Sequence, residues 1–383
     1  MNKQDWTYKK LVDECSILYG YPFDSKCFST SPDDMPLIRI RDVKEGKTST
    51  FYNGDYPKDY IIHKGDYLIG MDGEFNISPW QSKDALLNQR VCKISSNTSS
   101  LLIRYVYRFL IKELKKIEDE TPFVTVKHLS AKKINQIKIP VPPIGEQERI
   151  VAELDLLQGI IEKKKEQLKA YDQLAQSIFY TMFGDPIDNP KGWETDILEN
   201  VVSTDCCISY GIVQPGNEIE NGIPVVRPVD LVNQIVTRKG LKQIEKRISD
   251  DYKRTILKGG ELLFCVRGTT GVMSFASDDL KGCNVTRGIT PLSFNESINK
   301  YYAFYYLKTD GLQAMIADNT RGIALKQINM KDVRALPFLV PPLSLQQEFA
   351  EKVEAIERQK ALVQQSIEEV QTMFDCTMDK YFG

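Results

Sequence analysis

A long helical pattern that occurs twice constrains this chain more than any other feature. Residues 141–184 run from V-P-P-I-G-E-Q-E-R-I to S-I-F-Y-T-M-F-G, and residues 340–383 run from V-P-P-L-S-L-Q-Q-E-F to C-T-M-D-K-Y-F-G. The two copies align without a gap at an offset of 199 residues, which matches Gln147 with Gln346 and Gly184 with Gly383. Chance rarely holds such a register, so the alignment predicts an internal duplication.

The stretch before each helical pattern also repeats, with an offset that drifts from 187 to 199 residues. Trp6 opens the first copy, in a short segment predicted to be helix-like, and Trp193 opens the second. The strand-like segments P-L-I-R-I-R-D-V and K-G-D-Y-L-I-G-M-D-G correspond to P-V-V-R-P-V-D-L and K-G-G-E-L-L-F-C-V-R-G. A helical pattern follows in each copy, at residues 101–117 and 301–312. We therefore predict two copies of one mixed α/β unit.

Each long pattern carries apolar residues at intervals of three, four or seven. At 1.5 Å per residue, each helix would be about 55 Å long. Neither helix can cover its apolar stripe with its own short flanks, so mutual pairing as a two-helix coiled coil is predicted. Parallel and antiparallel pairing both satisfy the pattern. Antiparallel pairing would give the chain a pseudo-twofold axis, which suits a partner that is itself nearly twofold, and it is the arrangement predicted here.

Charge separates the globular stretches from the helical ones. The net charge of −2 divides into +4 for residues 1–142, −4 for 143–190, +2 for 191–342 and −4 for 343–383. Two mildly basic units therefore alternate with two acidic segments, which agrees with a polyanionic partner for the globular units. Solvated helices are often acidic for no functional reason, so the charge pattern alone does not decide the function.

Several functional classes lack their usual residues. The eight cysteines form no C-x-x-C pair and only His63 and His128 are available, so we expect buried free thiols and no zinc site. The sequence shows no Ser-His-Asp arrangement and no G-x-x-x-x-G-K-[ST] phosphate loop, so we expect no catalytic activity. No apolar run approaches the roughly 18 residues that span a bilayer, so we expect a cytoplasmic protein without a membrane partner.

The order of a globular unit, a V-P-P-x-x-x-Q helix ending in F-G, and then the same two parts again resembles the specificity subunit of type I restriction-modification systems. The resemblance covers the whole chain, and its motifs are residues 139–150 and 336–349, both F-G ends, and G-Y-P-F, L-I-R-I-R-D-V and L-I-G-M-D-G-E-F in the first unit. It implies an α+β fold with two target recognition domains, at 1–142 and 188–341. Two spacer helices, at 143–187 and 342–383, would pair as an antiparallel coiled coil.

The resemblance also implies a function. Each recognition domain would read one half of a split sequence in double-stranded DNA, and the helices would set the spacing and dock two methyltransferase subunits. Restriction subunits would complete the complex. The chain itself would bind no cofactor, and S-adenosylmethionine, ATP and Mg would belong to the partner subunits. The predicted docking residues are Gln147, Ile150, Leu154, Gln346, Phe349 and Val353. The second helix departs from the family's usual E-Q start, because it has Gln346-Gln347 there. The alternative is a coiled-coil adaptor whose globular units bind protein.

Candidate DNA contacts come from three kinds of segment. Arg39 and Arg41 are predicted on one face of a strand, and Arg227 takes the corresponding place in the second unit. Arginine forks bind guanine edges or phosphates, although solvation or ion pairs with Asp42 and Asp230 would explain these residues equally well. Glycine-containing loops and the start of a strand predicted at residues 88–94 supply the other candidates. The complete predicted set is Arg39, Arg41, Asp72, Glu74, Asn76, Gln89, Arg90, Arg227, Arg267, Thr269, Thr270 and Arg287.

Overall fold

The computed structural model describes residues 6–121, 127–206, 208–322 and 326–383. The chain forms two compact units: unit 1 consists of Met1–Lys165 with Gln365–Gly383, and unit 2 consists of Glu166–Gln364. The two long helices are α5 (Ile144–Phe183) and α11 (Leu343–Phe382), and each has one end in each unit. A unit therefore contains a globular part and the adjoining halves of both long helices.

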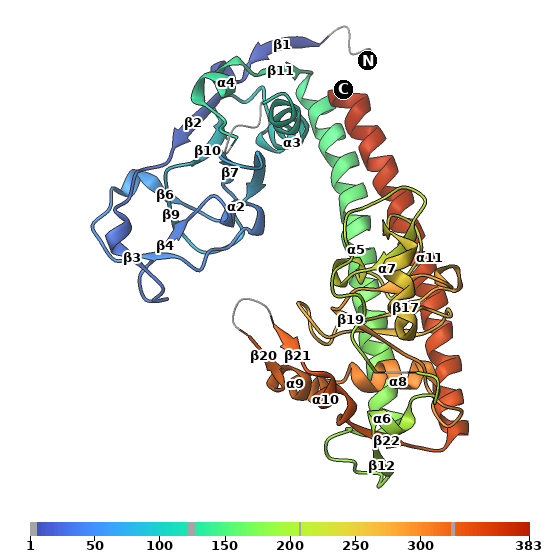
Figure 1. Cartoon of the computed structure of the whole chain (residues 1–383). Coiled ribbons are helices and arrows are strands. Elements are labelled where there is room, and N and C mark those ends of the chain that lie inside the picture. The colour runs from blue at the N-terminus through green and yellow to red at the C-terminus, as the bar shows by residue number, and fades with distance from the viewer. Residues whose placement is uncertain (1–5, 122–126, 207, 323–325) are drawn as a thin grey trace. The chain divides into compact units, whose positions relative to one another are not determined.

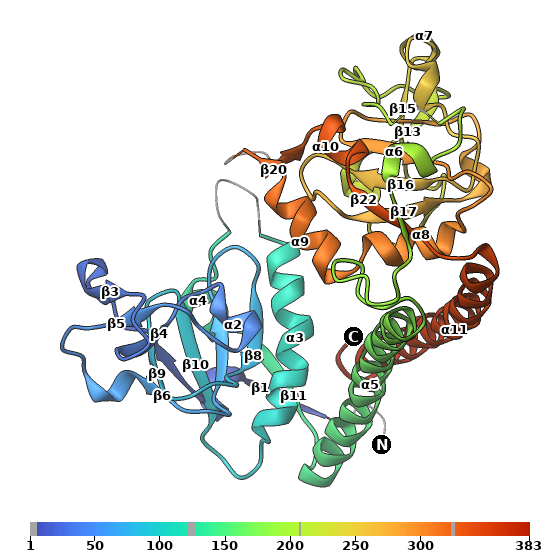
Figure 2. The ribbon, with the colours of Figure 1, turned by 90° about the horizontal axis from the view of Figure 1, so that it is seen from below.

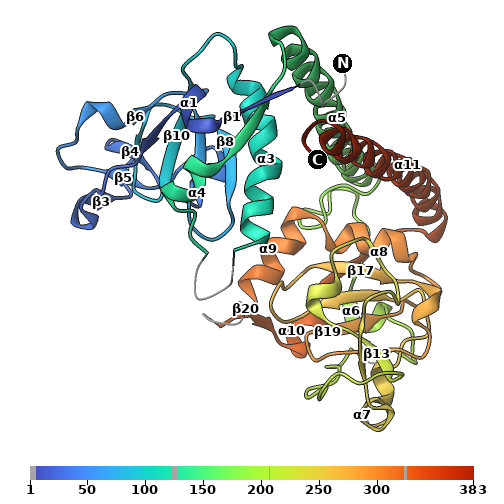
Figure 3. The same ribbon diagram turned by 90° about the horizontal axis from the view of Figure 1, so that it is seen from above.

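Unit 1 contains two larger sheets. The five-stranded sheet has the order β3 (Phe28–Ser29), β5 (Phe51–Tyr52), β4 (Met35–Ile38), β9 (Ala85–Leu87) and β6 (Ile61–Ile62), and its first strands lie together in Figure 3. The antiparallel four-stranded sheet has the order β2 (Cys15–Tyr19), β10 (Val91–Ser96), β7 (Tyr67–Gly70) and β8 (Asn76–Pro79). A two-stranded sheet joins β1 (Thr7–Lys10) to β11 (Lys138–Val141). The helices are α1 (Leu11–Glu14), α2 (Asp42–Glu45), α3 (Ile103–Asp119), which lies along β8 in Figure 2, and α4 (Ala131–Gln136).

Unit 2 has the same kind of architecture. One sheet has the order β15 (Lys242–Ile244), β13 (Ile223–Val226) and β18 (Asn284–Val285), and another has β14 (Ile235–Val236), β17 (Met273–Ala276), β16 (Leu262–Cys265) and β19 (Ile289–Leu292). Two strand pairs complete it, β12 (Glu194–Ile197) with β22 (Pro337–Val340) and β20 (Thr320–Arg321) with β21 (Gln327–Ile328). The short helices are α6 (Leu198–Val201), α7 (Lys246–Asp250), α8 (Lys300–Leu307), α9 (Asp310–Asp318) and α10 (Met330–Arg334).

A central parallel strand pair explains the apolar sequence of β4. Strand β4 pairs in parallel with β9, and neighbouring residues Leu37 and Ile38 are both fully buried. Leu37 packs with Phe23 and Tyr52, whereas Ile38 packs with Trp80 in a separate cluster. A strand buried on both faces needs consecutive apolar residues, so it shows no alternation of polar and apolar residues. The parallel pair β13 and β18 has the same role in unit 2.

The long helices contact each other in opposite directions. In unit 2, Lys360 donates to Asp172 over 2.7 Å, and Phe349 packs against Phe183 with ring centroids 5.4 Å apart. From the first contact to the second, the residue on α11 lies nearer the start of its helix (Phe349 after Lys360). The residue on α5 lies nearer the end of its helix (Phe183 after Asp172), beside α8 in Figure 1. This is the direction that was predicted. Regular coiled-coil packing along the whole seam stays a prediction.

The mixed α/β architecture is confirmed, but four local predictions are wrong. The strand predicted through residue 43 ends at Ile38, because the Asp42 carboxylate accepts the Arg39 N–H over 2.8 Å and closes a turn. Arg39 and Arg41 therefore lie beyond the strand. The strand predicted from residue 88 begins at Val91, the helix predicted at 301–312 is divided between α8 and α9, and the helix-like start of the chain is strand β1 followed by α1.

The cysteines follow their predicted character only in part. Cys15, Cys92, Cys265 and Cys283 are buried, and burial raises the pKa of the Cys92 thiol to about 12. Cys27 and Cys206 are half-buried, Cys376 is exposed, and Cys207 lies outside the described residues. Within the described ranges, no helix is both long and apolar enough to cross a membrane.

Candidate nucleic-acid interface

In each unit, the loops that follow the two strands of the parallel pair are polar and begin at the same edge of the sheet. Because β4 and β9 run in parallel, the turn after Ile38 and the loop after Leu87 start at the same edge of the sheet. In unit 2, the Thr286 N–H donates to the Val226 carbonyl over 2.9 Å, which places Arg287 beside the turn that begins at Arg227. Carboxyl ends of parallel strands are a common place for binding sites in such sheets.

Three separate segments meet next to this edge in unit 1. The Met71 N–H donates to the Arg90 carbonyl over 2.9 Å, and the Leu129 N–H donates to the Met71 carbonyl over 2.7 Å. The Gly73 N–H donates to the Lys127 carbonyl over 2.9 Å. We call residues 71–74, 88–90 and 127–129 the unit 1 junction.

Unit 2 repeats this backbone arrangement bond by bond. The Val266 N–H donates to the Gly288 carbonyl over 2.8 Å, the Ile328 N–H to the Val266 carbonyl over 3.0 Å, and the Gly268 N–H to the Lys326 carbonyl over 2.8 Å. Residues 266–270, 286–288 and 326–328 form the unit 2 junction. Gly73 and Gly268 have φ values of 73° and 91°, a conformation that favours glycine, so both copies keep a glycine at this turn.

Three polar side chains of the unit 1 junction lie in contact with one another. Asp72 Oδ1 lies 2.5 Å from His128 Nδ1, and Asp72 Oδ2 lies 3.4 Å from Arg90 Nε. The Asp72 side chain is 24% exposed, against 45% for His128 and 56% for Arg90, so the carboxylate is oriented by two partners that themselves face solvent. Arg90 has a φ of 76°, a strained conformation that costs roughly 1–3 kcal/mol for a residue with a side chain. Such strain is typical of functional sites.

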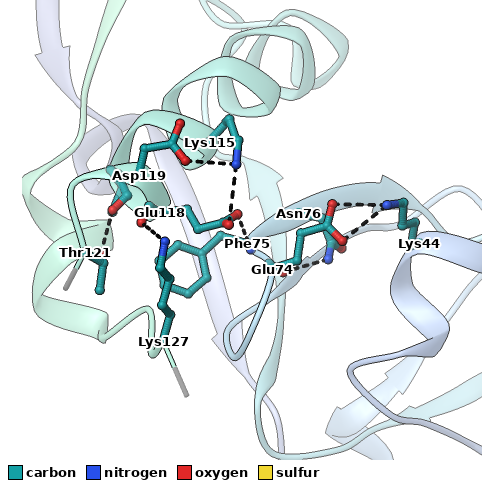
Figure 4. A network of polar contacts seen from close by, with 10 residues as sticks. Lys44, Glu74, Phe75, Asn76, Lys115, Glu118, Asp119, Thr121 and Lys127 are labelled. Atoms are coloured by element: carbon teal, nitrogen blue, oxygen red, sulfur yellow. Dashed lines mark hydrogen bonds and ion pairs between the residues drawn. The ribbon is translucent and has the colours of Figure 1, made fainter. Parts of the chain in front are cut away.

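The loop that carries Asp72 is tied to helix α3 and to helix α2. Figure 4 shows Glu118 accepting the Phe75 N–H over 3.1 Å while the Lys127 ammonium donates to the Glu118 carbonyl over 2.6 Å. On the other side of the loop, Lys44 pairs with Glu74 over 3.1 Å. These contacts hold the loop at Glu74 and Phe75, and the Met71 N–H bond to the Arg90 carbonyl holds its start, so Asp72 is presented from a backbone that is anchored on both sides.

The side chains of the unit 2 junction are different and mostly neutral or basic. Gln327 Nε2 donates to the Tyr210 hydroxyl over 3.0 Å, and the Arg287 guanidinium lies 5.6 Å from the centre of the Tyr210 ring. Arg267 occupies the place of Asp72, opposite Gln327 in an antiparallel bridge. Its buried Nε has no hydrogen-bond partner among the described residues. The same backbone thus presents an acid in unit 1 and a base in unit 2.

The structure brings some predicted DNA contacts together and separates others. Asp72 and Arg90 meet directly, whereas Glu74 pairs with Lys44 and its carbonyl accepts from Asn76 over 2.9 Å. The Gln89 side chain is exposed at the junction.

The remaining predicted positions are more dispersed. Arg39 is exposed, and Arg41 donates to Thr50 over 3.4 Å. Arg227 forms a forked ion pair with Asp230, at 3.1 and 2.9 Å, as the alternative interpretation required. In unit 2, Thr269 and Thr270 follow Arg267 in one loop, with the Thr270 hydroxyl 3.2 Å from Thr320.

Three side chains that contact the junctions or belong to them were missing from the predicted set although they bind or face its members: His128, Gln327 and Tyr210, which lies beside the unit 2 junction. A signal for two of them was present, because the 199-residue offset that aligns Lys127 with Lys326 also aligns His128 with Gln327. Tyr210 had no such signal, since its contact with Gln327 joins residues that are 117 positions apart.

The six predicted docking side chains are buried inside this chain. Gln147, Ile150, Leu154, Gln346, Phe349 and Val353 are each 0% exposed. Gln147 Oε1 accepts from the Leu102 N–H at 2.9 Å, and its Nε2 donates to the Ser100 and Pro142 carbonyls, both at 2.8 Å. Gln346 makes the matching three bonds, to Asn299, Ser297 and Pro341. Gln147 and Gln346 fasten the start of each long helix to its globular part, and none of the six side chains is exposed for contact with another chain.

Fold and loops together define a duplicated α+β protein whose units present equivalent loop sets with different side chains. The model of the family described as type I restriction modification DNA specificity domain matches residues 3–170 and 193–372, one match per copy. The chain belongs to this family.

Two curated relatives match along most of the chain. It is 30% identical over 375 residues to the type I restriction enzyme EcoBI specificity subunit of Escherichia coli, covering 92% of this chain and 79% of the relative. It is 23% identical over 391 residues to the MjaIX specificity subunit of Methanocaldococcus jannaschii, covering 92% and 87%.

Solved structures agree on the fold. The type I restriction-modification S subunit from M. genitalium superimposes with a TM-score of 0.51 at 13% identity, covering 99% of this chain and 96% of that one. A chain from work on complex assembly and conformational transition of the type I R-M system gives a TM-score of 0.54 at 20% identity, covering 98% and 97%. The predicted family resemblance and fold class are therefore confirmed.

Proposed function

We propose that this chain reads a two-part DNA sequence for a type I restriction-modification complex, with one unit facing each half of the target. The observation that carries the proposal is the pair of junctions, which share their backbone hydrogen bonds but not their side chains. A duplicated protein that binds one target twice would keep the same side chains. Divergence on a retained scaffold suits two different half-sites, because base identity is read by side-chain donors and acceptors.

The chain acts as a non-catalytic subunit, and its partners supply the chemistry. S-adenosylmethionine, ATP and Mg then belong to methyltransferase and restriction subunits. The modest basic surplus of the globular stretches, +4 and +2, supports weak DNA binding by the chain alone and stronger binding by the assembled complex. The cytoplasm is the compartment in which such a complex would meet DNA.

The methyltransferase subunits would dock on the exposed faces of α5 and α11. Leu174 is 46% exposed and Met373 is 57% exposed, and the 199-residue offset makes them the same position in the two copies. An exposed apolar side chain repeated at equivalent places suits one copy of a partner on each unit.

Methylation of genomic DNA by the purified complex tests the proposal. The chain is co-expressed with its methyltransferase subunits, and modified positions are mapped by sequencing. We expect one target in which two specified parts flank unspecified bases. Replacing residues 188–341 with those of a relative should change one part and leave the other unchanged. Methylation without sequence preference, or a change in both parts, contradicts the proposal. Steep loss of DNA affinity with salt distinguishes it from the protein-binding adaptor.

A further inference from the structure

Each junction contains two residues that pair in an isolated antiparallel bridge, and these bridge residues differ in charge between the two copies. Asp72 faces His128 in unit 1, and Arg267 faces Gln327 in unit 2. The neighbours on both sides keep their character between the copies: Gly73 and Gly268 form the same turn, and Lys127 and Lys326 follow the same aligned register. Only the bridge residues exchange an acidic group for a basic one on a retained backbone.

Asp72 is arranged as an acceptor at a surface of otherwise basic and polar groups. A free carboxylate would be repelled by DNA phosphates, but His128 and Arg90 lie within 2.5 and 3.4 Å of its oxygens. Among the base edges in the major groove, the cytosine N4 amino group is the donor that Asp side chains accept from. His128 binds the carboxylate rather than the base, so it acts as a positioning residue for Asp72.

Arg267 has the opposite chemistry at the matched place. A guanidinium carries five donors in a planar fork and no acceptor, which suits the O6 and N7 acceptors of guanine. Its Nε has no hydrogen-bond partner among the described residues, whereas Arg227 on the neighbouring turn is neutralised by Asp230. Among the described residues, Arg267 is thus the arginine of the two whose charge no carboxylate neutralises, and the outer nitrogens of its fork are the donors that could meet a base.

We propose that Asp72 and Arg267 are corresponding specificity-determining residues, with Asp72 reading a cytosine in one half-site and Arg267 reading a guanine in the other. This inference rests on the proposed function, since it names the bases that the two units read. It predicts that each half of the target contains a G·C pair at the position that faces the junction.

The test compares base preferences of complexes that contain single variants. The complex of the full chain with its methyltransferase subunits is assayed on an oligonucleotide library in which every target position is varied. Asp72→Asn should lower discrimination at one cytosine of one half-site by about 5- to 150-fold, the range that corresponds to the usual cost of one mismatched base pair. Arg267→Lys should do the same at one guanine of the other half-site. His128→Gln should relax the position that Asp72→Asn relaxes, to a smaller extent.

Matched controls come from the same units. His63 and Asp84 form an exposed pair in unit 1 at 2.9 Å, away from the junction, so Asp84→Asn removes a comparable carboxylate. Arg247 is an exposed arginine on α7 of unit 2, so Arg247→Lys matches Arg267→Lys. Both controls should leave every base preference unchanged.

A double variant tests whether the base preference of the unit 1 junction can be changed. Asp72→Arg with His128→Gln copies the unit 2 side chains onto the unit 1 backbone, and the preference at that position should change from cytosine to guanine. The inference is overturned if Asp72→Asn and Arg267→Lys assemble but leave all preferences intact, or if both relax the same half-site. Should Asp72→Asn fail to assemble, Arg267→Lys and the double variant decide in the same way. A wild-type complex that ignores sequence would refute the proposed function itself, whereas a two-part target insensitive to these variants refutes only this inference.

Discussion

The starts of the two long helices carry the same key side chain in both copies, whereas the loop junctions carry different side chains. At the helix starts, Gln147 and Gln346 make the same three hydrogen bonds in both units and are fully buried. At the junctions, the backbone bonds are equally well matched, but Asp72 is replaced by Arg267. The fully buried glutamines, which bind backbone groups, kept their identity, and the partly exposed side chains at the junction bridge did not. Divergence at the junctions therefore agrees with the proposal that these side chains act on something outside the chain.

Replacing Phe349, a buried aromatic residue close to Gln346 on α11, should give the largest loss of stability. Phe349 packs against Phe179 and Phe183 with ring centroids 5.6 and 5.4 Å apart. We expect Phe349→Ala to lower the free energy of unfolding by about 4 kcal/mol, because it leaves a cavity in a closed core. Urea denaturation measures the loss, with Leu343→Ala at the more exposed helix start as the control. A loss below about 1 kcal/mol would mean that the core is not closed here.

Removing the hydrogen bonds of Gln147 or of Gln346 should lower the free energy of unfolding slightly less than Phe349→Ala, and by the same amount in both copies. Gln147→Ala and Gln346→Ala each leave one buried backbone N–H and two carbonyls without their partners, so we expect about 3 kcal/mol for each. The exposed Gln167→Ala on the same helix is the control and should change stability by less than about 0.5 kcal/mol. Unequal losses in the two copies would break the equivalence of the helix starts.

A third contact has diverged although it is partly buried, and its two versions should differ in strength. Arg108 in α3 binds Asp155 at 2.6 and 3.2 Å, whereas Tyr305 in α8 donates to Glu357 over 3.2 Å. Arg108→Ala should cost about 2 kcal/mol, because a largely buried ion pair is lost while Arg104 still neutralises Asp155. Tyr305→Phe should cost about 1 kcal/mol, the net value of one hydrogen bond. Thermal unfolding of both variants makes the comparison, and the reverse order would contradict it.

Exposed apolar positions on the long helices should matter least for folding and most for assembly. Leu174→Asp and Met373→Asp should change the free energy of unfolding by less than about 0.5 kcal/mol, since both side chains are largely exposed. Each should remove one of two methyltransferase subunits, which native mass spectrometry of the co-expressed complex counts. Leu174→Met serves as the control. Full occupancy with both aspartates present would show that docking uses another surface.

Prediction from sequence succeeded where the signal is local and repeated. The periodic apolar residues placed helices at 144–183 and 343–382 within a few residues, and the helix predicted at 101–117 is α3. It failed at Arg39, because a strand that continues to residue 43 and a strand that ends at Ile38, before an Asp42-capped turn, give the same run of letters. It also failed for Gln147, whose polar side chain suggested a surface position but which is satisfied by three backbone groups in the interior.

The duplication and the pair of long helices follow from the sequence, because a constant 199-residue offset and a helical period can be read without knowing any contact. Which polar side chains bind partners within the chain and which face outward depends on the tertiary structure. Asp72 meets His128 across 56 residues and Gln327 meets Tyr210 across 117, and pairings over such separations depend on how the strands are ordered in the sheets. That order depends on burial of both faces of β4 and β13, which no local pattern specifies.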